Sequence, residues 1–227
     1  MKKHIPNAIT CLNLFSGCIA VLFALKGEFT CAFYAVLFSG ICDFFDGMVA
    51  RALHVKSLIG KELDSLADMV SFGFLPGAVI YVMLQQASTN MYIPYIGFVI
   101  TVFSALRLAK FNIDERQTSD FIGLNTPMNT FFIISLPFIA ADYPMLFLEP
   151  YLLIAITLVT SFLLVSEIKL FSMKLSNLSW AANKYKYSFL MLSIALVMWL
   201  QFLSLPLILL SYILFSMLHF ANAKKEL

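Results

Sequence analysis

Charged side chains are scarce in this chain of 227 residues. They make up 12% of the sequence, against roughly 25% in a typical soluble domain, and this shortage argues against a soluble globular protein. Closely paired cysteines are absent as well. Cys11, Cys18, Cys31 and Cys42 form no CxxC pair, so a disulfide framework or a cysteine-based zinc site is not expected. With 61% hydrophobic residues and a mean hydropathy of +0.88, the composition indicates an integral membrane protein.

Long apolar runs divide the chain into membrane-length segments. A helix needs about 20 mostly apolar residues to cross the hydrocarbon core. We expect an all-α, polytopic helix bundle with about eight such helices, near residues 7–25, 29–53, 59–85, 91–110, 127–143, 147–168, 187–203 and 205–221. Only Pro206 separates the last two segments, so a re-entrant hairpin there is the alternative. No linker or repeat interrupts the pattern, and we expect a single domain over residues 1–227.

The basic residues indicate how the bundle is oriented. With eight spans, 14 of the 15 Lys and Arg residues fall on one side and Lys26 alone falls on the other. The fourteen are Lys2, Lys3, Arg51, Lys56, Lys61, Arg107, Lys110, Arg116, Lys169, Lys174, Lys184, Lys186, Lys224 and Lys225. Because cytoplasmic loops carry the excess of positive charge, we expect a multi-pass protein of the inner (cytoplasmic) membrane with both termini in the cytoplasm. This topology explains the net charge of +2 without a nucleic-acid partner.

Four aspartates interrupt two of the apolar segments. Asp43 and Asp46 lie near the end of the second predicted helix, and Asp64 and Asp68 lie near the start of the third. Each pair falls on one helical face, and a short connection makes the two helices antiparallel neighbours. We therefore expect the four carboxylates to converge near the cytoplasmic surface, where the active site should also lie.

Carboxylates gathered in this way repel one another in a poor dielectric unless a cation neutralises them. Each costs roughly 2.5–3.5 kcal/mol at the centre of a membrane. Oxygen-only ligands favour Mg²⁺ or Mn²⁺, with Ca²⁺ as a further option, and four aspartates suit two ions. A structural ion pair is the alternative, but Arg51 is the one nearby cation.

Small residues and one arginine share the faces that carry the aspartates. Gly47, Ala50 and Gly60 leave room for a ligand near the backbone, and Arg51 suits phosphate; close helix packing is the alternative for the small residues. On the first predicted helix, Asn13 falls on a polar face and is a further candidate for binding the nucleotide or its phosphates. Helix capping and helix packing are the alternatives there.

The spacing of these residues resembles that of a known family. The run D-x2-D-G-x2-A-R-x8-G-x3-D-x3-D, within residues 43–68, matches the full motif of the CDP-alcohol phosphatidyltransferases at all eight positions. The resemblance implies transfer of a phosphatidyl group from a CDP-linked lipid to an alcohol, with release of CMP. It implies that the four aspartates hold two metal ions and that Asp68 is also the general base. With such a donor, we expect the ligand beside Gly47, Ala50, Arg51 and Gly60 to be the CDP-lipid.

Further stretches resemble the bacterial, membrane-integral phosphatidylserine synthase branch of this family. They are PNAITCLNLFSG (6–17), MVSFGFLPG (69–77), RLAKFN (107–112), FIGLNTPMN (121–129) and LLVSEIKLFSMK (163–174). The resemblance implies CDP-diacylglycerol as donor, L-serine as acceptor and a membrane-lipid product. The resemblance also makes a homodimer possible. The chain departs from the branch at Lys110, Asn125, Met128 and Lys169.

Serine recognition requires a cation for the carboxylate and a polar group for the amine. Arg107 and Lys110, at the end of the fourth predicted helix, are the candidates for the carboxylate, and Asn112 is the candidate for the amine. The alternative is that Arg107 and Lys110 only obey the positive-inside rule.

Two other functions fit parts of the pattern. The same chemistry with glycerol 3-phosphate or inositol phosphate as acceptor would favour a denser basic pocket. A divalent-cation transporter would favour acidic residues at several depths, whereas here the aspartates cluster at one end. We therefore favour the phosphatidyltransferase.

Overall fold

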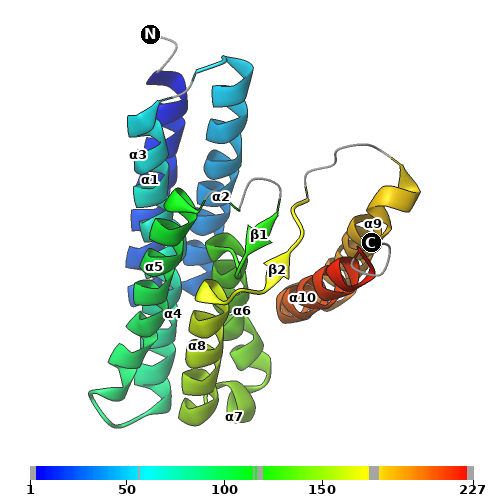
Figure 1. Cartoon of the computed structure of the whole chain (residues 1–227). Coiled ribbons are helices and arrows are strands. Elements are labelled where there is room, and N and C mark those ends of the chain that lie inside the picture. The colour runs from blue at the N-terminus through cyan, green and yellow to red at the C-terminus, as the bar shows by residue number, and fades with distance from the viewer. Residues whose placement is uncertain (1–3, 56, 115, 117–119, 174–178, 224–227) are drawn as a thin grey trace.

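The computed structural model describes residues 4–55, 57–114, 116, 120–173 and 179–223. It is a bundle of long helices with one short strand pair (Figure 1), which confirms the predicted all-α class. Helix α1 (His4–Leu25) and helix α2 (Phe29–Ala52) pack along one another, joined by a turn in which Gly27 has φ of 77°. Lys2, Lys3, Lys56, Lys174, Lys224 and Lys225 lie outside the described residues.

The third predicted span is one helical rod with a change of pitch inside it. Helix α3 (Leu58–Asp68) runs into the π-helix η1 (Met69–Phe74), which continues as α4 (Leu75–Ala87). Ser57 caps the rod by accepting a hydrogen bond from the Gly60 N–H at 3.2 Å. Hydrophobic periodicity predicts the rod at 59–85 but gives no sign of the π-turn, which begins directly after Asp68.

Three more long helices and two short ones complete the main bundle among the described residues. The 3₁₀ helix η2 (Ile93–Phe98) leads into α5 (Val99–Ile113), followed by α6 (Thr126–Asp142), the short α7 (Pro144–Phe147) and α8 (Pro150–Val165). Asn125 and Glu149 cap α6 and α8 through their side chains, and the prolines in the first turns suit positions whose N–H has no helical partner. Helix α4 lies in the middle of the bundle, where Leu75, Ile80 and Leu84 are fully buried.

A pair of two-residue strands holds two connections together. Strand β1 (Phe121–Ile122) pairs antiparallel with β2 (Lys169–Leu170). The next residue, Gly123, has φ of 77° and donates its N–H to the Ile168 carbonyl at 2.9 Å. A Cβ at this position would lie 2.6 Å from the Leu164 carbonyl oxygen, so glycine suits both the conformation and the space.

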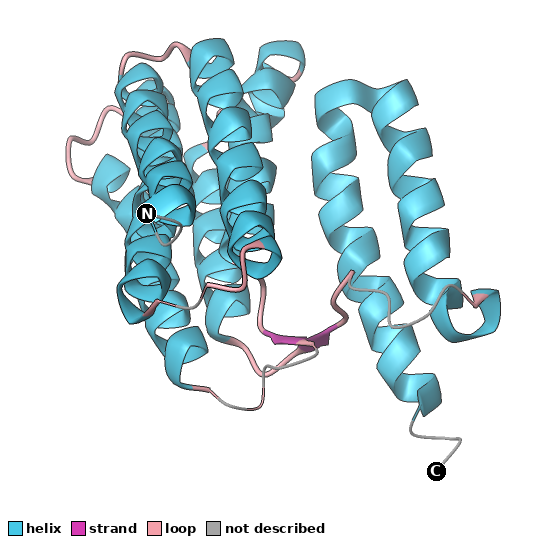
Figure 2. Ribbon diagram, turned by 90° about the horizontal axis from the view of Figure 1, so that it is seen from above, coloured by secondary structure: helices cyan, strands magenta, loops and turns pink. Residues whose placement is uncertain are grey.

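The last two helices form a hairpin that stands beside the main bundle. Helix α9 (Trp180–Leu200) passes through the 3₁₀ turn η3 (Gln201–Leu203) into α10 (Ser204–Ala223), and both views show the pair set off from the other helices (Figures 1 and 2). The break lies at Gln201, with φ of 46°, whereas Pro206 lies inside the first turn of α10. The Tyr212 hydroxyl on α10 donates to the carbonyl of Phe171, the residue after β2, at 2.7 Å and so ties the hairpin to the main bundle.

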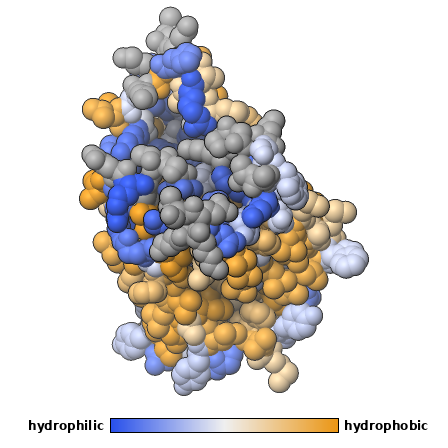
Figure 3. All heavy atoms as spheres, turned by 45° about the vertical axis from the view of Figure 1, so that its right-hand side comes forward, coloured by the Kyte–Doolittle hydropathy of each residue, from blue (hydrophilic) through white to orange (hydrophobic). Residues whose placement is uncertain are grey.

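The surface and the helix lengths agree with a membrane location. Within the described residues, five helical stretches are long and apolar enough to cross a membrane: His4–Leu25, Phe29–Ala52, Leu58–Ala87, Ile93–Ile113 and Asn183–Asn222. The last of these contains both arms of the hairpin, and α8 is apolar but shorter. Figure 3 shows a broad apolar band below a polar end. A membrane helix bundle is therefore confirmed, while eight complete crossings stay a prediction.

Candidate active site

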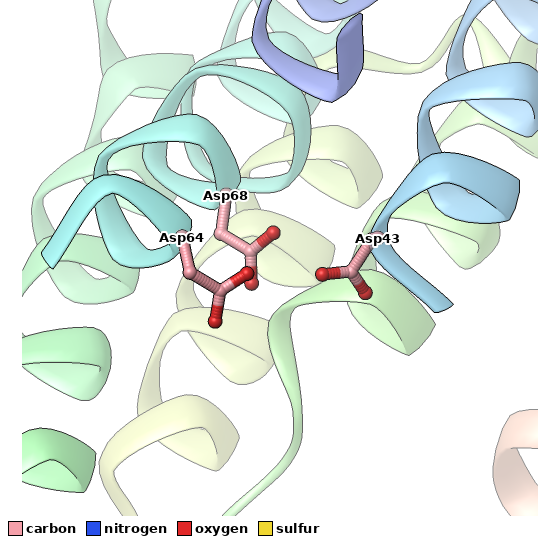
Figure 4. Close-up of side chains that lie close together, drawn as sticks. All are labelled: Asp43, Asp64 and Asp68. Atoms are coloured by element: carbon pink, nitrogen blue, oxygen red, sulfur yellow. The ribbon is translucent and has the colours of Figure 1, made fainter. Parts of the chain in front are cut away.

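Three of the four aspartates meet between two helices. Asp43 on α2 faces Asp64 and Asp68 on α3 (Figure 4), and one carboxylate oxygen from each lies within 4.8 Å of the others. The i, i+4 spacing on α3 places Asp64 and Asp68 one turn apart on one face, and the antiparallel α2 brings Asp43 opposite them. The convergence predicted from the sequence is thus present for these three residues.

Asp46 belongs to the site but lies outside this group. Its side chain is buried, with 6% exposed, and its Oδ2 accepts a hydrogen bond of 2.6 Å from the Thr10 hydroxyl on α1. It contributes with Asp64 to the wall of the adjoining cavity. Asp43, Asp64 and Asp68 therefore form one group, and Asp46 lies next to it. Of these three grouped residues, only Asp64 also lines the cavity.

The donor set fits a hard divalent cation. Three carboxylates of the same sign share a partly buried space, and Asp64 Oδ1 is a buried oxygen that accepts no hydrogen bond within the described residues. Such an oxygen costs free energy unless something binds it, and carboxylate oxygens are the ligands that Mg²⁺, Mn²⁺ and Ca²⁺ prefer. Asp43, Asp64 and Asp68 could therefore hold a divalent ion.

A cavity of about 450 Å³ opens beside the aspartates, between α1, α2, α3 and the turn that joins α2 to α3. Among the predicted lipid-binding residues, Gly47, Ala50 and Gly60 line it. A Cβ at Gly60 would lie 3.0 Å from the Asn7 side-chain oxygen, so a larger residue there would crowd the cavity. The small residues thus leave open space at the site, as the sequence predicts.

Two of the predicted ligand contacts lie elsewhere. Arg51 is exposed and is not among the lining residues of the cavity, although its Nη1 comes within 3.4 Å of where a Cβ of Gly47 would stand. Asn13 is fully buried and donates a hydrogen bond to Asp68 rather than lining the cavity. Lys61 was counted in the sequence only as one of the positive charges that set the orientation, but it lines the cavity.

The three residues predicted to bind serine do not converge. Arg107 on α5 is 7% exposed, interacts electrostatically with Asp68, and has its guanidinium carbon 4.8 Å from the centre of the Phe111 ring. Its Nε donates no hydrogen bond within the described residues. Lys110 forms an ion pair of 2.5 Å with Glu167. Asn112 donates to the Ser65 hydroxyl at 2.8 Å. Of these three residues, only Arg107 is buried.

The ion pair of Lys110 belongs to a small exposed network. Arg116 contacts Glu167 at 3.5 Å and also pairs with Asp114. The hydrogen bond and charge of Lys110 lower the pKa of Glu167, which lies beyond the end of α8. This network connects the end of α5 to the connection after α8, a role that differs from the predicted contact with serine.

A second cavity, also of about 450 Å³, was not predicted from the sequence. It lies among α2, α6, α9, α10 and the strand pair, with a mostly apolar wall that includes Phe44, Met128, Phe189 and Tyr212. Phe44 directly follows Asp43, so this wall begins one residue from the acidic group. Its residues come from distant parts of the chain, and no local pattern could have identified it.

Comparison with known proteins agrees with this geometry. The family model described as CDP-alcohol phosphatidyltransferase matches residues 3–163, a stretch that includes all four aspartates. A protein of Bacillus subtilis (strain 168) named CDP-diacylglycerol–serine O-phosphatidyltransferase is 35% identical over 172 residues, which cover 74% of this chain and 89% of the Bacillus protein.

Proteins with the same name match over shorter stretches. In Helicobacter pylori (strain J99 / ATCC 700824) the identity is 36% over 125 residues, 54% of this chain and 52% of that protein. In Saccharomyces cerevisiae (strain ATCC 204508 / S288c) it is 38% over 123 residues, 50% of this chain and 43% of that protein. The aligned part thus spans about half the length of these two relatives.

Proposed function

The chain belongs to the CDP-alcohol phosphatidyltransferase family, and on that premise we propose that it transfers the phosphatidyl group of CDP-diacylglycerol to the hydroxyl of L-serine. The products are phosphatidylserine and CMP. The observation that carries the proposal is the meeting of Asp43, Asp64 and Asp68 beside an open cavity. The names of the relatives support serine as the acceptor.

The reaction exchanges one phosphorus–oxygen bond for another. The serine oxygen forms a bond to the phosphorus that bears the lipid, and the bond from that phosphorus to the oxygen of CMP breaks. The hydroxyl proton must leave as the new bond forms, and Asp68 is the proposed acceptor. A well-placed general base contributes about 10²–10⁴-fold to such a step. The departing CMP retains the bridging oxygen.

The donor lies with its nucleotide in the cavity between α1, α2 and α3. Gly47, Ala50 and Gly60 leave space along the wall for the cytidine diphosphate group, and Arg51 provides positive charge nearby. Divalent ions, proposed to be two Mg²⁺ or Mn²⁺ ions with Ca²⁺ as a further candidate, would be held by Asp43, Asp46, Asp64 and Asp68 and would neutralise the diphosphate charge. The diacylglycerol chains stay in the hydrocarbon of the bilayer.

Arg107 is the best-placed candidate for the serine carboxylate. It is buried and interacts electrostatically with Asp68, and its Nε–H donates no hydrogen bond to any described residue. A buried arginine with an unused donor suits a carboxylate because the guanidinium offers paired N–H groups. Lys110 and Asn112 were also predicted to bind serine. In the structure they contact Glu167 and Ser65, so these contacts would have to break before either residue could bind serine.

The proposal includes a location and an organisation. The distribution of Lys and Arg supports a place in the inner, cytoplasmic membrane with both termini and the aspartates on the cytoplasmic side. A single domain over residues 1–227 is supported by the contacts of the C-terminal hairpin with α6 and β2. A homodimer stays a prediction drawn from the family.

The test measures serine-dependent CMP release by the purified protein in lipid nanodiscs that contain CDP-diacylglycerol. We expect CMP and labelled phosphatidylserine in equal amounts, and neither product when glycerol 3-phosphate or inositol phosphate replaces serine. Turnover with one of these and not with serine would assign another acceptor to the same chemistry. Uptake of Mn²⁺ into proteoliposomes that lack any CDP-lipid would favour a transporter instead.

Two variants test the base. Asp68→Asn should reduce turnover by about 10²–10⁴-fold, the contribution of a general base. Asp142→Asn removes a carboxylate at the exposed end of α6 and should leave turnover unchanged. Equal CMP release by Asp68→Asn and the wild type would remove Asp68 from the mechanism.

A further inference from the structure

Helix α1 carries none of the aspartates, yet it contacts two of them. Thr10 donates to Asp46 Oδ2 at 2.6 Å, and Asn13 Nδ2 donates to Asp68 Oδ1 at 3.3 Å. Thr10 and Asn13 are three residues apart and therefore lie on one face of the helix. Both side chains are buried, with 3% and 0% exposed. One face of α1 thus reaches a carboxylate on α2 and another on α3.

The orientation of the Asn13 amide is determined by its neighbours. An ionised carboxylate only accepts hydrogen bonds, so the amide nitrogen must face Asp68 and the amide oxygen must face the other way. There Oδ1 accepts a hydrogen bond from the Ser71 hydroxyl at 2.7 Å. The Ser39 hydroxyl, on α2, contacts the same Oδ1 at 2.5 Å and the backbone carbonyl oxygen of Asn13 at 2.8 Å, and it lies 2.9 Å from Ser71 Oγ. Ser39 and Ser71 are both fully buried.

The π-helix explains how Ser71 comes to this position. It starts at Met69, directly after Asp68, inside a rod that is otherwise α-helical. Single π-turns inside α-helices occur frequently at functional sites. Ser71 approaches α1 so closely that a Cβ at Gly17 would lie 2.1 Å from its hydroxyl oxygen. The absence of a side chain at Gly17 therefore permits the contact between the π-turn and α1.

We infer that Asn13 is a positioning residue for Asp68, with an amide that is fixed in turn by Ser39 and Ser71. Its N–H holds one oxygen of Asp68 and keeps the carboxylate directed towards Asp43 and Asp64 (Figure 4). Partners that orient a ligating carboxylate affect metal affinity and activity by about 10–100-fold when removed. This role differs from the direct contact with the CDP-lipid for which the sequence pattern makes Asn13 a candidate.

The experiment compares three variants by turnover and by binding of Mn²⁺ in the presence of CMP, measured by electron paramagnetic resonance. Asn13→Leu keeps a similar volume but removes the donor, and we expect Mn²⁺ affinity and kcat to fall by about 10–100-fold. Asn13→Asp keeps the shape but replaces the donor with a further carboxylate that repels Asp68, so the loss of kcat should be larger. Ser71→Ala removes only the support of the amide and should give a smaller loss in both measurements.

The order of these variants separates positioning from packing. If Asn13 only fills space, the isosteric Asn13→Asp should be the mildest change, whereas the inference requires it to be the most severe. At saturating Mn²⁺, the KM for CDP-diacylglycerol should remain unchanged in Asn13→Leu. A raised KM with normal kcat and Mn²⁺ binding would show contact with the lipid and overturn the inference.

Ser16→Ala is the matched control. The Ser16 hydroxyl on α1 donates to the Ala35 carbonyl on α2 at 2.6 Å and is buried, but it contacts no aspartate. Its loss should lower thermal stability and leave kcat and Mn²⁺ affinity unchanged. If Ser16→Ala and Asn13→Leu impair both functions equally, the effect is structural and the inference fails. Ser71→Ala and Asn13→Asp retain the test should Asn13→Leu not fold.

The kinetic part of this inference rests on the proposed function, whereas Mn²⁺ binding does not. A wild-type protein that binds Mn²⁺ but releases no CMP with serine would contradict the proposed function, and the binding order of the variants would still decide the role of Asn13. An active wild type whose Asn13→Asp and Ser71→Ala variants bind Mn²⁺ and turn over normally would contradict the positioning role alone.

Discussion

The close approach of α1 to the π-helix leads to a prediction about stability. Gly17→Ala would place a methyl group 2.1 Å from Ser71 Oγ and 3.0 Å from Ser71 Cα. Overpacking of this kind costs about 1–3 kcal/mol, and the short distance to a backbone atom favours the upper end. Replacing glycine by alanine inside a helix recovers about 0.5–1 kcal/mol. The net destabilisation should be about 2 kcal/mol.

Thermal unfolding in detergent measures this effect. For a protein of about this size, 1 kcal/mol corresponds to roughly 2–4 °C in Tm, so Gly17→Ala should lower Tm by about 4–8 °C. Gly40→Ala is the matched control on α2, because the nearest atom to its new methyl group, on the Phe131 ring, is 3.5 Å away. This variant has room and should raise Tm by about 1–4 °C.

A double variant tests the cause of the destabilisation. Ser71→Ala removes the hydroxyl oxygen that meets the new methyl group, so Gly17→Ala combined with Ser71→Ala should lose less stability than the sum of the two single changes. Additive losses would mean that the hydroxyl is not the obstacle. Equal Tm values for Gly17→Ala and Gly40→Ala would refute the close packing of the π-helix on α1.

Three further predictions concern ligands and metal. Arg107→Lys should raise the KM for serine by about 10–100-fold, because a charge-assisted hydrogen bond contributes roughly 1.5–3 kcal/mol. Lys110→Ala should leave this KM nearly unchanged, since Lys110 pairs with Glu167. A larger rise of the KM for serine in Lys110→Ala than in Arg107→Lys would favour Lys110 as the carboxylate ligand. Gly60→Val should raise the KM for CDP-diacylglycerol and not that for serine, because the side chain enters the cavity towards Asn7; equal effects on both KM values would contradict this placement of the nucleotide. Removal of divalent ions with EDTA should abolish CMP release, and it should lower Tm because the folded state loses a bound ligand. Adding Mg²⁺ or Mn²⁺ should restore both. Full activity after exhaustive chelation would exclude a metal-dependent site.

The sequence determined the features that depend on local patterns. Apolar runs of membrane length predicted the main helices to within a few residues at most ends, because hydrocarbon thickness fixes how many residues a span requires. Helical periodicity placed Asp64 and Asp68 on one face, and a short connection brought Asp43 opposite them. The order and spacing of the motif identified the family, as the comparisons confirm.

Tertiary structure decided which side chains contact one another. Periodicity could not predict that Lys110 would pair with Glu167, 57 residues away, or that Asn112 would contact Ser65, since such contacts follow from how separate helices pack. The π-turn after Asp68 could not be predicted either, because its residues are as apolar as those of the α-helices on both sides of it. It places Ser71 against Asn13, and this contact across 58 residues orients the amide that holds Asp68. Sequence spacing fixes positions along one helix, whereas the partner of a buried polar group depends on which helices meet there.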